Sequence, residues 1–181
     1  MVQTASTMLP LGTKAPSFQL TDVLSGKKVG LLPSQGTVII FMCNHCPYVI
    51  HIIHTLLKVA NDYGIQGFRF LAINSNDTHK YPDDSPEKMK EWGQKLNFPF
   101  PYLFDETQEV AKAYQAACTP DFYVFDREMK CVYRGQFDDS RPGQSQPVTG
   151  KDLTAALDQM IKGQPVSADQ RPSVGCNIKW K

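Results

Sequence analysis

The amino-acid sequence predicts an α/β protein with a mixed central β-sheet flanked by helices. Two continuous apolar runs, 37–43 and 68–75, contain the β-branched residues typical of buried strands. Between them, apolar residues recur at helical spacing over 47–63, so a strand–helix–strand unit with parallel strands is expected. Two later runs, 122–125 and 131–137, are joined by a short turn. They are predicted to form an antiparallel hairpin, which makes the sheet mixed.

Polar residues mark the starts of three further helices. Ser85, which precedes a proline, is predicted to cap a helix that ends near residue 97. Asp105 is expected to cap a helix that ends near residue 114, and Thr149 to open a last helix that ends near residue 162. Two short stretches, 18–20 and 28–32, flank a Ser-Gly turn and are predicted to form an N-terminal hairpin.

The chain of 181 residues has the length of one domain. We expect a single domain over 1–181, with a core at about 10–162 and a C-terminal extension at 163–181. The extension shows no apolar periodicity, yet Ile178 and Trp180 stand close together near its end. A disordered tail would be poorer in large apolar residues, so both side chains are expected to be anchored on the body of the domain.

Composition argues against several classes of protein. Lys and Arg total 19 and Asp and Glu total 18, so no basic surplus indicates a nucleic-acid partner. No apolar run approaches the roughly 20 residues of a membrane helix, and the first ten residues do not resemble a secretory signal. These features predict a cytoplasmic protein that binds neither nucleic acid nor membrane. An odd count of five cysteines then favours reactive, metal-binding or simply buried thiols over a disulfide scaffold.

The most informative motif is Cys43-Asn44-His45-Cys46, which follows the first buried strand and precedes a helix. Chemistry in open α/β sheets gathers at this edge, and the partial positive charge of a helix N-terminus favours a thiolate. Two cysteines at this spacing on a tight turn can form and break a disulfide, so the pair is predicted to be redox-active. Pro47 fits best as the first helical residue. Cys46 would then be the cap and would feel the helix dipole as strongly as Cys43.

A metal site and an unreactive pair are the alternatives to a redox dithiol. Zinc needs about four nitrogen or sulfur ligands, and Cys43, Cys46 and His45 supply at most three. A soft ion such as Cu(I) could accept two thiolates, so metal binding stays open although no metal is expected to be required. The sequence contains neither a G-x-G-x-x-G nor a G-x-x-x-x-G-K-[ST] pattern, and no organic cofactor is expected.

The sequence contains four longer motifs, the first of which includes the cysteine pair: FMCNHCPYV, ACTPDFYVFD, YRGQFDDSRP and a final GCNIKWK. Together with the order of elements, they resemble the thioredoxin fold, and most of all its alkyl hydroperoxide reductase/thiol-specific antioxidant branch. Within that branch the motifs are similar to those of a group of uncharacterised peroxiredoxin-like, thioredoxin-domain proteins. The resemblance runs from Leu9 to the C-terminus.

The resemblance implies roles for four residues. Cys43 matches the attacking cysteine of thioredoxins, and Cys46 matches the resolving one. Pro120 would be a cis-proline that faces the dithiol. Thr119 would offer its backbone to an extended substrate or partner peptide.

A dedicated peroxidase is the less favoured interpretation of the same resemblance. In peroxiredoxins the peroxide-reducing cysteine falls at the second position of the motif, where Cys46-Pro47 fits. However, Cys43 replaces the usual threonine, and Ile39 stands where a proline is expected. Pro120 also lies near the position where an activating arginine would come.

Five further residues are candidates for auxiliary roles, and most have a purely structural alternative. His45 could bias the pKa of the cysteines or shuttle a proton. Cys118 could be a third redox thiol or a small buried apolar residue, and Cys176 could be a resolving cysteine or an ordinary buried one. Asp138 and Arg141 begin a long polar loop, where they could tune the dithiol, hold a substrate, or only form surface salt bridges.

The sequence therefore predicts a thiol-disulfide oxidoreductase that acts by dithiol–disulfide exchange through Cys43 and Cys46. A thiol peroxidase with antioxidant activity is the enzymatic alternative, and a metal-binding or redox-sensing module is the non-enzymatic one. The expected partner is a disulfide-containing protein or a small thiol or peroxide substrate. A separate reductant, which the sequence does not identify, would restore the dithiol.

Overall fold

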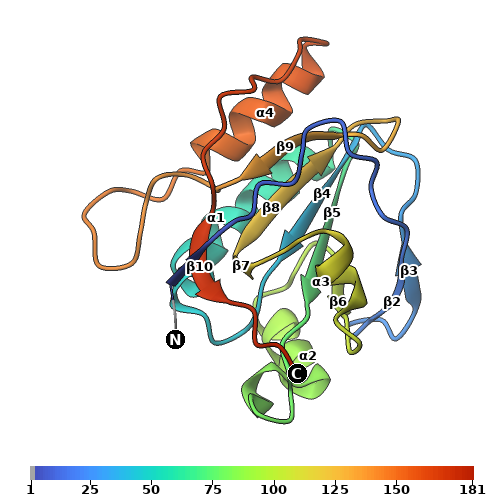
Figure 1. Cartoon of the computed structure of the whole chain (residues 1–181), viewed down its shortest axis with the longest axis vertical. Helices are drawn as coiled ribbons and strands as arrows, with labels where there is room; N and C mark the ends of the chain where they lie inside the picture. Colours follow the sequence, from blue (N-terminus) through green and yellow to red (C-terminus); the bar gives the residue numbers. More distant parts are fainter. Residues whose placement is uncertain (1–2) are drawn as a thin grey trace.

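The computed structural model describes residues 3–181 and contains one large and one small β-sheet (Figure 1). The strands are β1 (Gln3–Ala5), β2 (Gln19–Asp22), β3 (Lys28–Gly30), β4 (Gly36–Phe41), β5 (Phe68–Asn74), β6 (Tyr102–Phe104), β7 (Cys118–Thr119), β8 (Asp121–Phe125), β9 (Cys131–Gly135) and β10 (Val174–Asn177). The helices are α1 (Pro47–Gly64), α2 (Pro86–Lys95), α3 (Glu109–Ala113) and α4 (Lys151–Ile161), with a 3-10 turn at Pro82–Asp84.

The large sheet has the strand order β3-β2-β6-β5-β4-β8-β9. Strand β5 is parallel to both of its neighbours, β4 and β6, whereas β8 pairs antiparallel with β4 and with β9. Strands β2 and β3 form the predicted N-terminal hairpin. The parallel unit, the late hairpin and the mixed character of the sheet are thereby confirmed.

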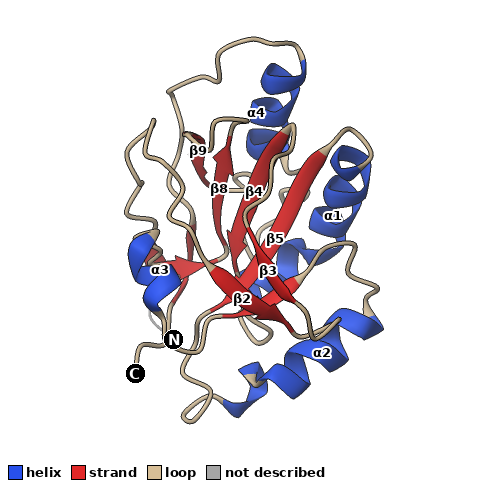
Figure 2. Ribbon diagram, turned by 90° about the vertical axis from the view of Figure 1, so that its right-hand side faces the viewer, coloured by secondary structure: helices blue, strands red, loops and turns tan. Residues whose placement is uncertain are grey.

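Helices α1 and α4 cover one face of the large sheet, and α3 covers the other (Figure 2). Successive residues of a strand point to opposite faces, and β4 shows this clearly. Val38 and Ile40 belong to the core that includes α1 and α4, whereas Ile39 and Phe41 belong to the core that includes α3. Every residue of β4 is buried, because both faces of this central strand are covered.

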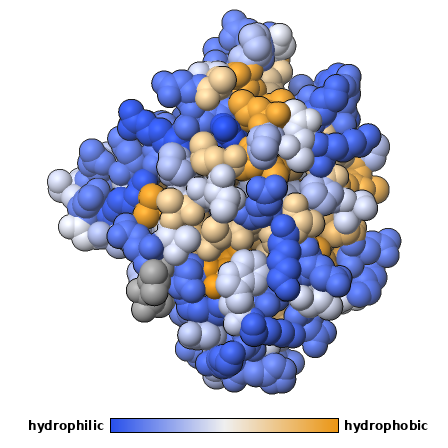
Figure 3. All heavy atoms as spheres, viewed as in Figure 1, coloured by the Kyte–Doolittle hydropathy of each residue, from blue (hydrophilic) through white to orange (hydrophobic). Residues whose placement is uncertain are grey.

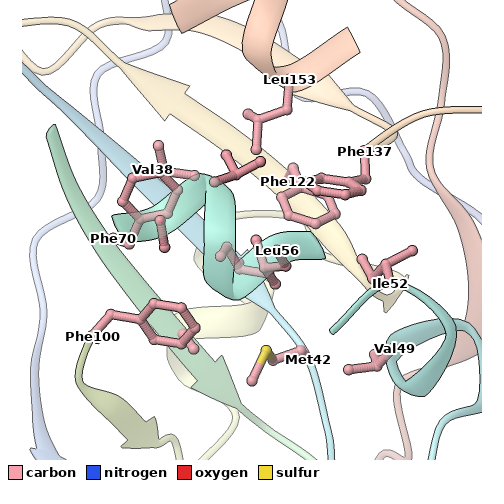
Figure 4. Close-up of a cluster of buried hydrophobic side chains, with 14 of the residues drawn as sticks. Val38, Met42, Val49, Ile52, Leu56, Phe70, Phe100, Phe122, Phe137 and Leu153 are labelled. Atoms are coloured by element: carbon pink, nitrogen blue, oxygen red, sulfur yellow. The ribbon is translucent and has the colours of Figure 1, made fainter. Parts of the chain in front are cut away.

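Figure 4 shows the core beneath α1 and α4. Leu56 of α1 and Leu153 of α4 are completely buried there. The rings of Phe122 and Phe137 stack beside them with their centroids 5.4 Å apart. Full burial of one such side chain is worth about 1.5–3 kcal/mol, so this core holds α1 firmly against the end of β4.

The cysteine motif forms the connection between β4 and α1. The backbone of Met42 still bonds to the carbonyl of Ile73 at 2.9 Å, so the sheet continues up to Cys43. Cys46 is the helix cap, with φ −72° and ψ 120°. This extended conformation is the one that a residue before proline prefers, and Pro47 opens the helix as expected.

The C-terminal extension forms a strand that the sequence analysis does not predict. Strand β10 lies between β1 and β7 in a small antiparallel sheet with the order β1-β10-β7 (Figure 1). The three strands have two to four residues each, too few to show an alternating pattern. The first strand of the described chain therefore pairs with the last.

The expected anchoring of the tail holds for Ile178 and is wrong for Trp180. The side chain of Ile178 is 1% exposed, whereas that of Trp180 is 40% exposed. Lys179 supplies the second anchor through its backbone instead. Its carbonyl accepts hydrogen bonds from the backbone of Asp77 and the side chain of Gln108, both at 2.8 Å.

Helix α3 begins later than expected. The predicted start follows Asp105, but the first helical residue is Glu109. Gln108 adopts a left-handed conformation with φ +64°, which interrupts the turn and sends its side chain to the carbonyl of Lys179. Asp105 still accepts a hydrogen bond at 2.9 Å from the N–H of Ala111. It therefore satisfies a backbone donor in the first turn of α3, although it is not the residue directly before the helix.

Helix α4 also begins later, at Lys151 rather than at Thr149. The residue before it, Gly150, has a φ of +68°, which favours glycine. A Cβ atom there would lie 2.6 Å from the ring of Phe137, so the site excludes a larger residue.

No helix within residues 3–181 is both long and apolar enough to cross a bilayer. On the face drawn in Figure 3, hydrophobic side chains lie in small groups among hydrophilic ones.

Candidate functional site

The two predicted motifs meet at the end of β4. Sγ of Cys43 lies 3.5 Å from Oγ1 of Thr119, and Sγ of Cys46 lies 3.1 Å from the carbonyl oxygen of Thr119. The Thr119–Pro120 peptide bond is cis, as the resemblance implied. Both cysteines are buried. Residues far apart in the sequence thus form one site, because β7 and β8 bring Thr119 next to the strand that ends at Cys43.

A third cysteine completes the site. Cys176 lies opposite Thr119 in the pairing of β10 with β7. Its Sγ is 2.9 Å from Sγ of Cys46, and none of the five cysteines forms a disulfide in this structure. Sequence reasoning named Cys176 as a candidate resolving cysteine, but it did not predict strand β10, which brings Cys176 to the site.

Hydrogen bonds make Cys46 the more acidic of the two motif cysteines. The Cys43 thiol contributes most, Cys176 and Thr119 contribute less, and together they outweigh burial and lower the pKa of Cys46 to about 5. The backbone N–H of Val49, at the start of α1, adds to the effect. The carbonyl of Thr119 accepts a hydrogen bond only from the neutral thiol, so it opposes ionisation.

The pKa of Cys43 is raised well above its usual range. Its hydrogen bond to Cys46 is the main cause, and burial and the nearby charge of Asp84 add to it. The site therefore favours a Cys46 thiolate next to a neutral Cys43 thiol. The resemblance to thioredoxins assigns the attack to Cys43, whereas this electrostatic arrangement favours Cys46.

Asp84 is a site residue that the sequence analysis missed. Its buried carboxylate accepts hydrogen bonds from the backbone N–H of Asn44 and the side chain of Asn76, both at 2.8 Å, and lies 2.7 Å from Nδ1 of His45. The hydrogen bond to Asp84 raises the pKa of His45, although partial burial works against this. Asp84 stands in the 3-10 turn Pro82–Asp84, and its separation from Asn44 of the motif by 40 positions leaves no local signal.

The tip of the motif is also fixed from the side of β6. The hydroxyl of Tyr102 donates a hydrogen bond at 2.9 Å to Oδ1 of Asn44, and the side-chain amide of Asn44 donates to the carbonyl of Asp83 at 2.8 Å. Asn44 and His45 are thereby held by residues outside the motif. Such support keeps the two flanking sulfurs in place.

Cys43, His45 and Asp84 could together hold a metal ion, since one ligand atom from each lies within 4.8 Å of the others. This set differs from the one considered from the sequence, because Asp84 takes the place of Cys46. The carboxylate of Asp84 is already bound by Asn44 and Asn76. A metal would also have to displace the proton that the environment keeps on Cys43. The donor set therefore fits thiol chemistry better than metal binding.

The remaining candidates lie around this centre. Cys118 is buried, with its Sγ 3.7 Å from the carbonyl of Pro120, and burial raises its pKa, so it is a neutral thiol. Asp138 and Arg141 line the same small pocket as Pro120. Their described hydrogen bonds, however, stay within the loop and the residues that flank it, with Asp138 accepting from the N–H of Gly150 at 2.7 Å.

Comparison with known proteins places the chain in context. A model of the AhpC/TSA family matches residues 11–134. Among solved structures, an uncharacterized conserved protein from Geobacillus kaustophilus shares 59% identity with a TM-score of 0.98, covering 100% of this chain and 97% of that one. A hypothetical protein from Sinorhizobium meliloti shares 46% identity with a TM-score of 0.96, covering 98% of each chain. No curated protein matches the chain.

A more distant likeness concerns the fold alone. A putative thioredoxin from Neisseria meningitidis shares 24% identity with a TM-score of 0.64, covering 87% of this chain and 93% of that one. The mixed sheet with α1 after its central strand is accordingly the thioredoxin fold that the motifs implied.

Proposed function

We propose that this chain, which belongs to the AhpC/TSA family, is a thiol-disulfide oxidoreductase that acts through Cys43 and Cys46. One observation carries the proposal: the sulfurs of Cys43 and Cys46 lie at the end of β4 against Thr119 of the cis Thr119–Pro120 bond, 3.5 Å from its Oγ1 and 3.1 Å from its carbonyl oxygen respectively. A thiolate is the attacking species in disulfide exchange, and a neighbouring thiol is needed to release the product.

The exchange takes two steps. The Cys46 thiolate attacks one sulfur of a substrate disulfide, forms a mixed disulfide and releases the other sulfur as a thiolate. Cys43 then attacks Cys46 and expels the second substrate sulfur. The proton of Cys43 goes to one released thiolate, and the other released thiolate takes a proton from water. The protein loses two electrons and ends with a Cys43–Cys46 disulfide. The substrate gains both electrons and ends as two thiols, and a separate reductant reverses the change in the protein.

We expect Thr119 to assist the exchange through a hydrogen bond to Cys43, and His45 to assist it through its charge and its proton. Oγ1 of Thr119 lies within 3.5 Å of the Cys43 sulfur and can exchange a hydrogen bond with it as the thiol loses its proton. The hydrogen bond to Asp84 raises the pKa of His45, which favours the protonated ring within the motif. That charge favours a nearby thiolate and can supply a proton to a departing one.

Peptide mapping with a small disulfide as substrate tests the proposal. Wild-type protein treated with oxidised glutathione is expected to lose thiols reversibly and to yield a peptide linked through Cys43 and Cys46. Cys46→Ser should abolish glutathione reduction, whereas the double variant Cys43→Ser, Cys176→Ser, which has no thiol beside Cys46, should stop at a glutathionylated Cys46. Cys131→Ser is the matched control, because Cys131 is buried in the core on the α3 side of the sheet. If wild-type protein keeps both motif thiols free, the proposal is wrong.

Peroxide reduction is a second candidate, and the acidity of Cys46 at the second motif position favours it. Against it, the main groups that lower the pKa of Cys46 are thiols, a threonine and a backbone N–H rather than an arginine. Hydrogen peroxide distinguishes the two reactions. A peroxidase should form a sulfenic acid at Cys46 in a Cys43→Ser, Cys176→Ser variant faster than glutathione modifies that residue.

A further inference from the structure

Strand β10 occupies the backbone edge that the resemblance assigns to a substrate peptide. Cys176 pairs with Thr119 and Asn177 pairs with Cys118 in an antiparallel register. Gly175 packs so closely on this edge that a Cβ atom there would lie 2.0 Å from the carbonyl oxygen of Thr119. The position opposite the dithiol is thus filled by the chain's own strand, which carries a cysteine.

The position of this strand is fixed at several points along its length. The backbone N–H of Ser6 donates to the carbonyl of Ser173 at 2.8 Å, and that of Ile178 donates to the carbonyl of Ala117 at 3.1 Å. β1 pairs with its other edge, and Ile178 is buried in the core on the α3 side. The proximity of Cys176 to the site therefore follows from strand pairing and packing on both sides.

The three sulfurs place Cys46 within reach of two partners. Cys43 forms a hydrogen bond with Cys46 within the motif, and the Cys176 sulfur on β10 lies 2.9 Å from the Cys46 sulfur. Bonded sulfurs are about 2.05 Å apart, so a movement of about an ångström joins Cys46 to Cys176. The same sulfur can thus form a disulfide with either neighbour.

We propose that Cys176 is a third redox-active cysteine, which exchanges with the Cys43–Cys46 disulfide to form a Cys46–Cys176 disulfide on β10. This inference rests on the proposed function, since it starts from the disulfide that the exchange reaction produces. It adds a second oxidised form in which Cys43 is a free thiol again.

The exchange step balances within the chain. The Cys176 sulfur attacks the Cys46 sulfur, the Cys46–Cys176 bond forms, and the Cys43–Cys46 bond breaks. The proton on Cys176 ends on Cys43, so no external oxidant, reductant or base is consumed. Both of these thiols have raised pKa values, chiefly through burial for Cys176 and through the hydrogen bond to Cys46 for Cys43. Burial, which raises both pKa values, remains when Cys46 is in a disulfide, so it favours the neutral thiol of whichever cysteine lies outside the bridge.

Disulfide mapping of cysteine variants tests the inference. After equilibration in glutathione buffers of graded potential, wild-type protein and the Cys131→Ser control are expected to contain both the 43–46 and the 46–176 links. Cys43→Ser should retain only the 46–176 link, and Cys176→Ser only the 43–46 link. A wild-type protein that forms the 43–46 link, but no 46–176 link even in Cys43→Ser, would overturn this inference and leave the proposed function standing. A protein that forms neither link would overturn the proposed function as well.

Gly175→Ala provides a test that keeps all five cysteines. The added methyl group collides with the carbonyl of Thr119 and should move β10 away from the site. The expected result is a loss of the 46–176 link with the 43–46 link retained, in a protein whose circular dichroism matches that of wild type. Retention of the 46–176 link at wild-type level in this folded variant would contradict the role assigned to the position of β10. If the variant does not fold, the cysteine variants above still decide the question.

Discussion

Nδ1 of His45 lies 2.7 Å from Oδ2 of Asp84, a carboxylate with no exposure to solvent. The same carboxylate binds the backbone N–H of Asn44. Asp84 therefore holds the loop between the two cysteines in place through these two contacts. Its negative charge also favours the protonated form of His45.

Asp84→Asn should lower the pKa of His45 towards the ordinary value of about 6.5, because the amide keeps the shape of the carboxylate and removes its charge. Nuclear magnetic resonance titration of the His45 ring checks this directly. Asp83→Asn is the matched control, since the Asp83 side chain is exposed and Asp83 contacts the motif through its backbone carbonyl. An unchanged His45 titration in Asp84→Asn would contradict the assigned cause.

The same pair predicts how stability depends on pH. The pKa of His45 is raised in the folded protein. The contribution of its interaction with Asp84 to the free energy of unfolding is therefore fully present below the unfolded pKa of about 6.5. It is lost as the pH rises through the folded value. The stability advantage of wild type over Asp84→Asn should therefore shrink between neutral and alkaline pH, as measured by urea unfolding. If the difference in unfolding free energy between wild type and Asp84→Asn does not vary with pH, the ion pair between His45 and Asp84 is not its cause.

Cys46 should titrate far below an ordinary thiol, with its ultraviolet thiolate absorbance appearing near pH 5. Its pKa is lowered by folding, so the stabilisation is present above the unfolded value of about 8.5 and is lost as the pH falls through about 5. Cys43→Ala removes the main donor and should raise the Cys46 pKa, whereas Cys43→Ser retains a hydroxyl donor and should raise it less. Equal titrations in the two variants would exclude the hydrogen bond as the cause.

Ile178→Ala should destabilise the protein by about 2–5 kcal/mol, because it empties a fully enclosed position. Trp180→Ala should change stability much less, although tryptophan is the larger residue, because its side chain is 40% exposed. Thermal unfolding of the two variants gives the comparison. A larger loss in Trp180→Ala would mean that the tail is held mainly by its tryptophan.

Asp138→Ala should lower stability by about 1 kcal/mol, because this carboxylate accepts bonds from the backbone N–H groups of Thr149 and Gly150 just before α4. The pKa of Cys46 should not move, since Asp138 is not among the main groups that shift it. A changed Cys46 titration would instead support the tuning role considered for Asp138.

The parts of this fold that were predictable carry their own local signals. The buried strand β4, which ends just before the cysteine motif, is a continuous apolar run, and the cap of α2 at Ser85 is a polar residue before proline. Thr119 and Pro120 were recognisable from their motif. Each of these signals lies within about ten residues, which is the range over which periodicity and capping act.

The parts that were not predictable depend on distant neighbours. Cys176 has a defined position only because β10 enters between β1 and β7, and neither of these short strands has a pattern of its own. Asp84 belongs to the site because a loop 40 residues away folds over Asn44. Burial and pairing of this kind arise from tertiary contacts, which a sequence pattern does not encode locally.

The place of β10 between β1 and β7 has a consequence for synthesis on the ribosome. The residues that build the central sheet emerge before residue 174, so most of that sheet can form while β10 is still in the exit tunnel. Until then β1 lacks its partner strand, and the Cys46 sulfur lacks the cover of Cys176. Before β10 pairs with β7, the dithiol therefore lacks the cover that this strand gives it in the folded protein.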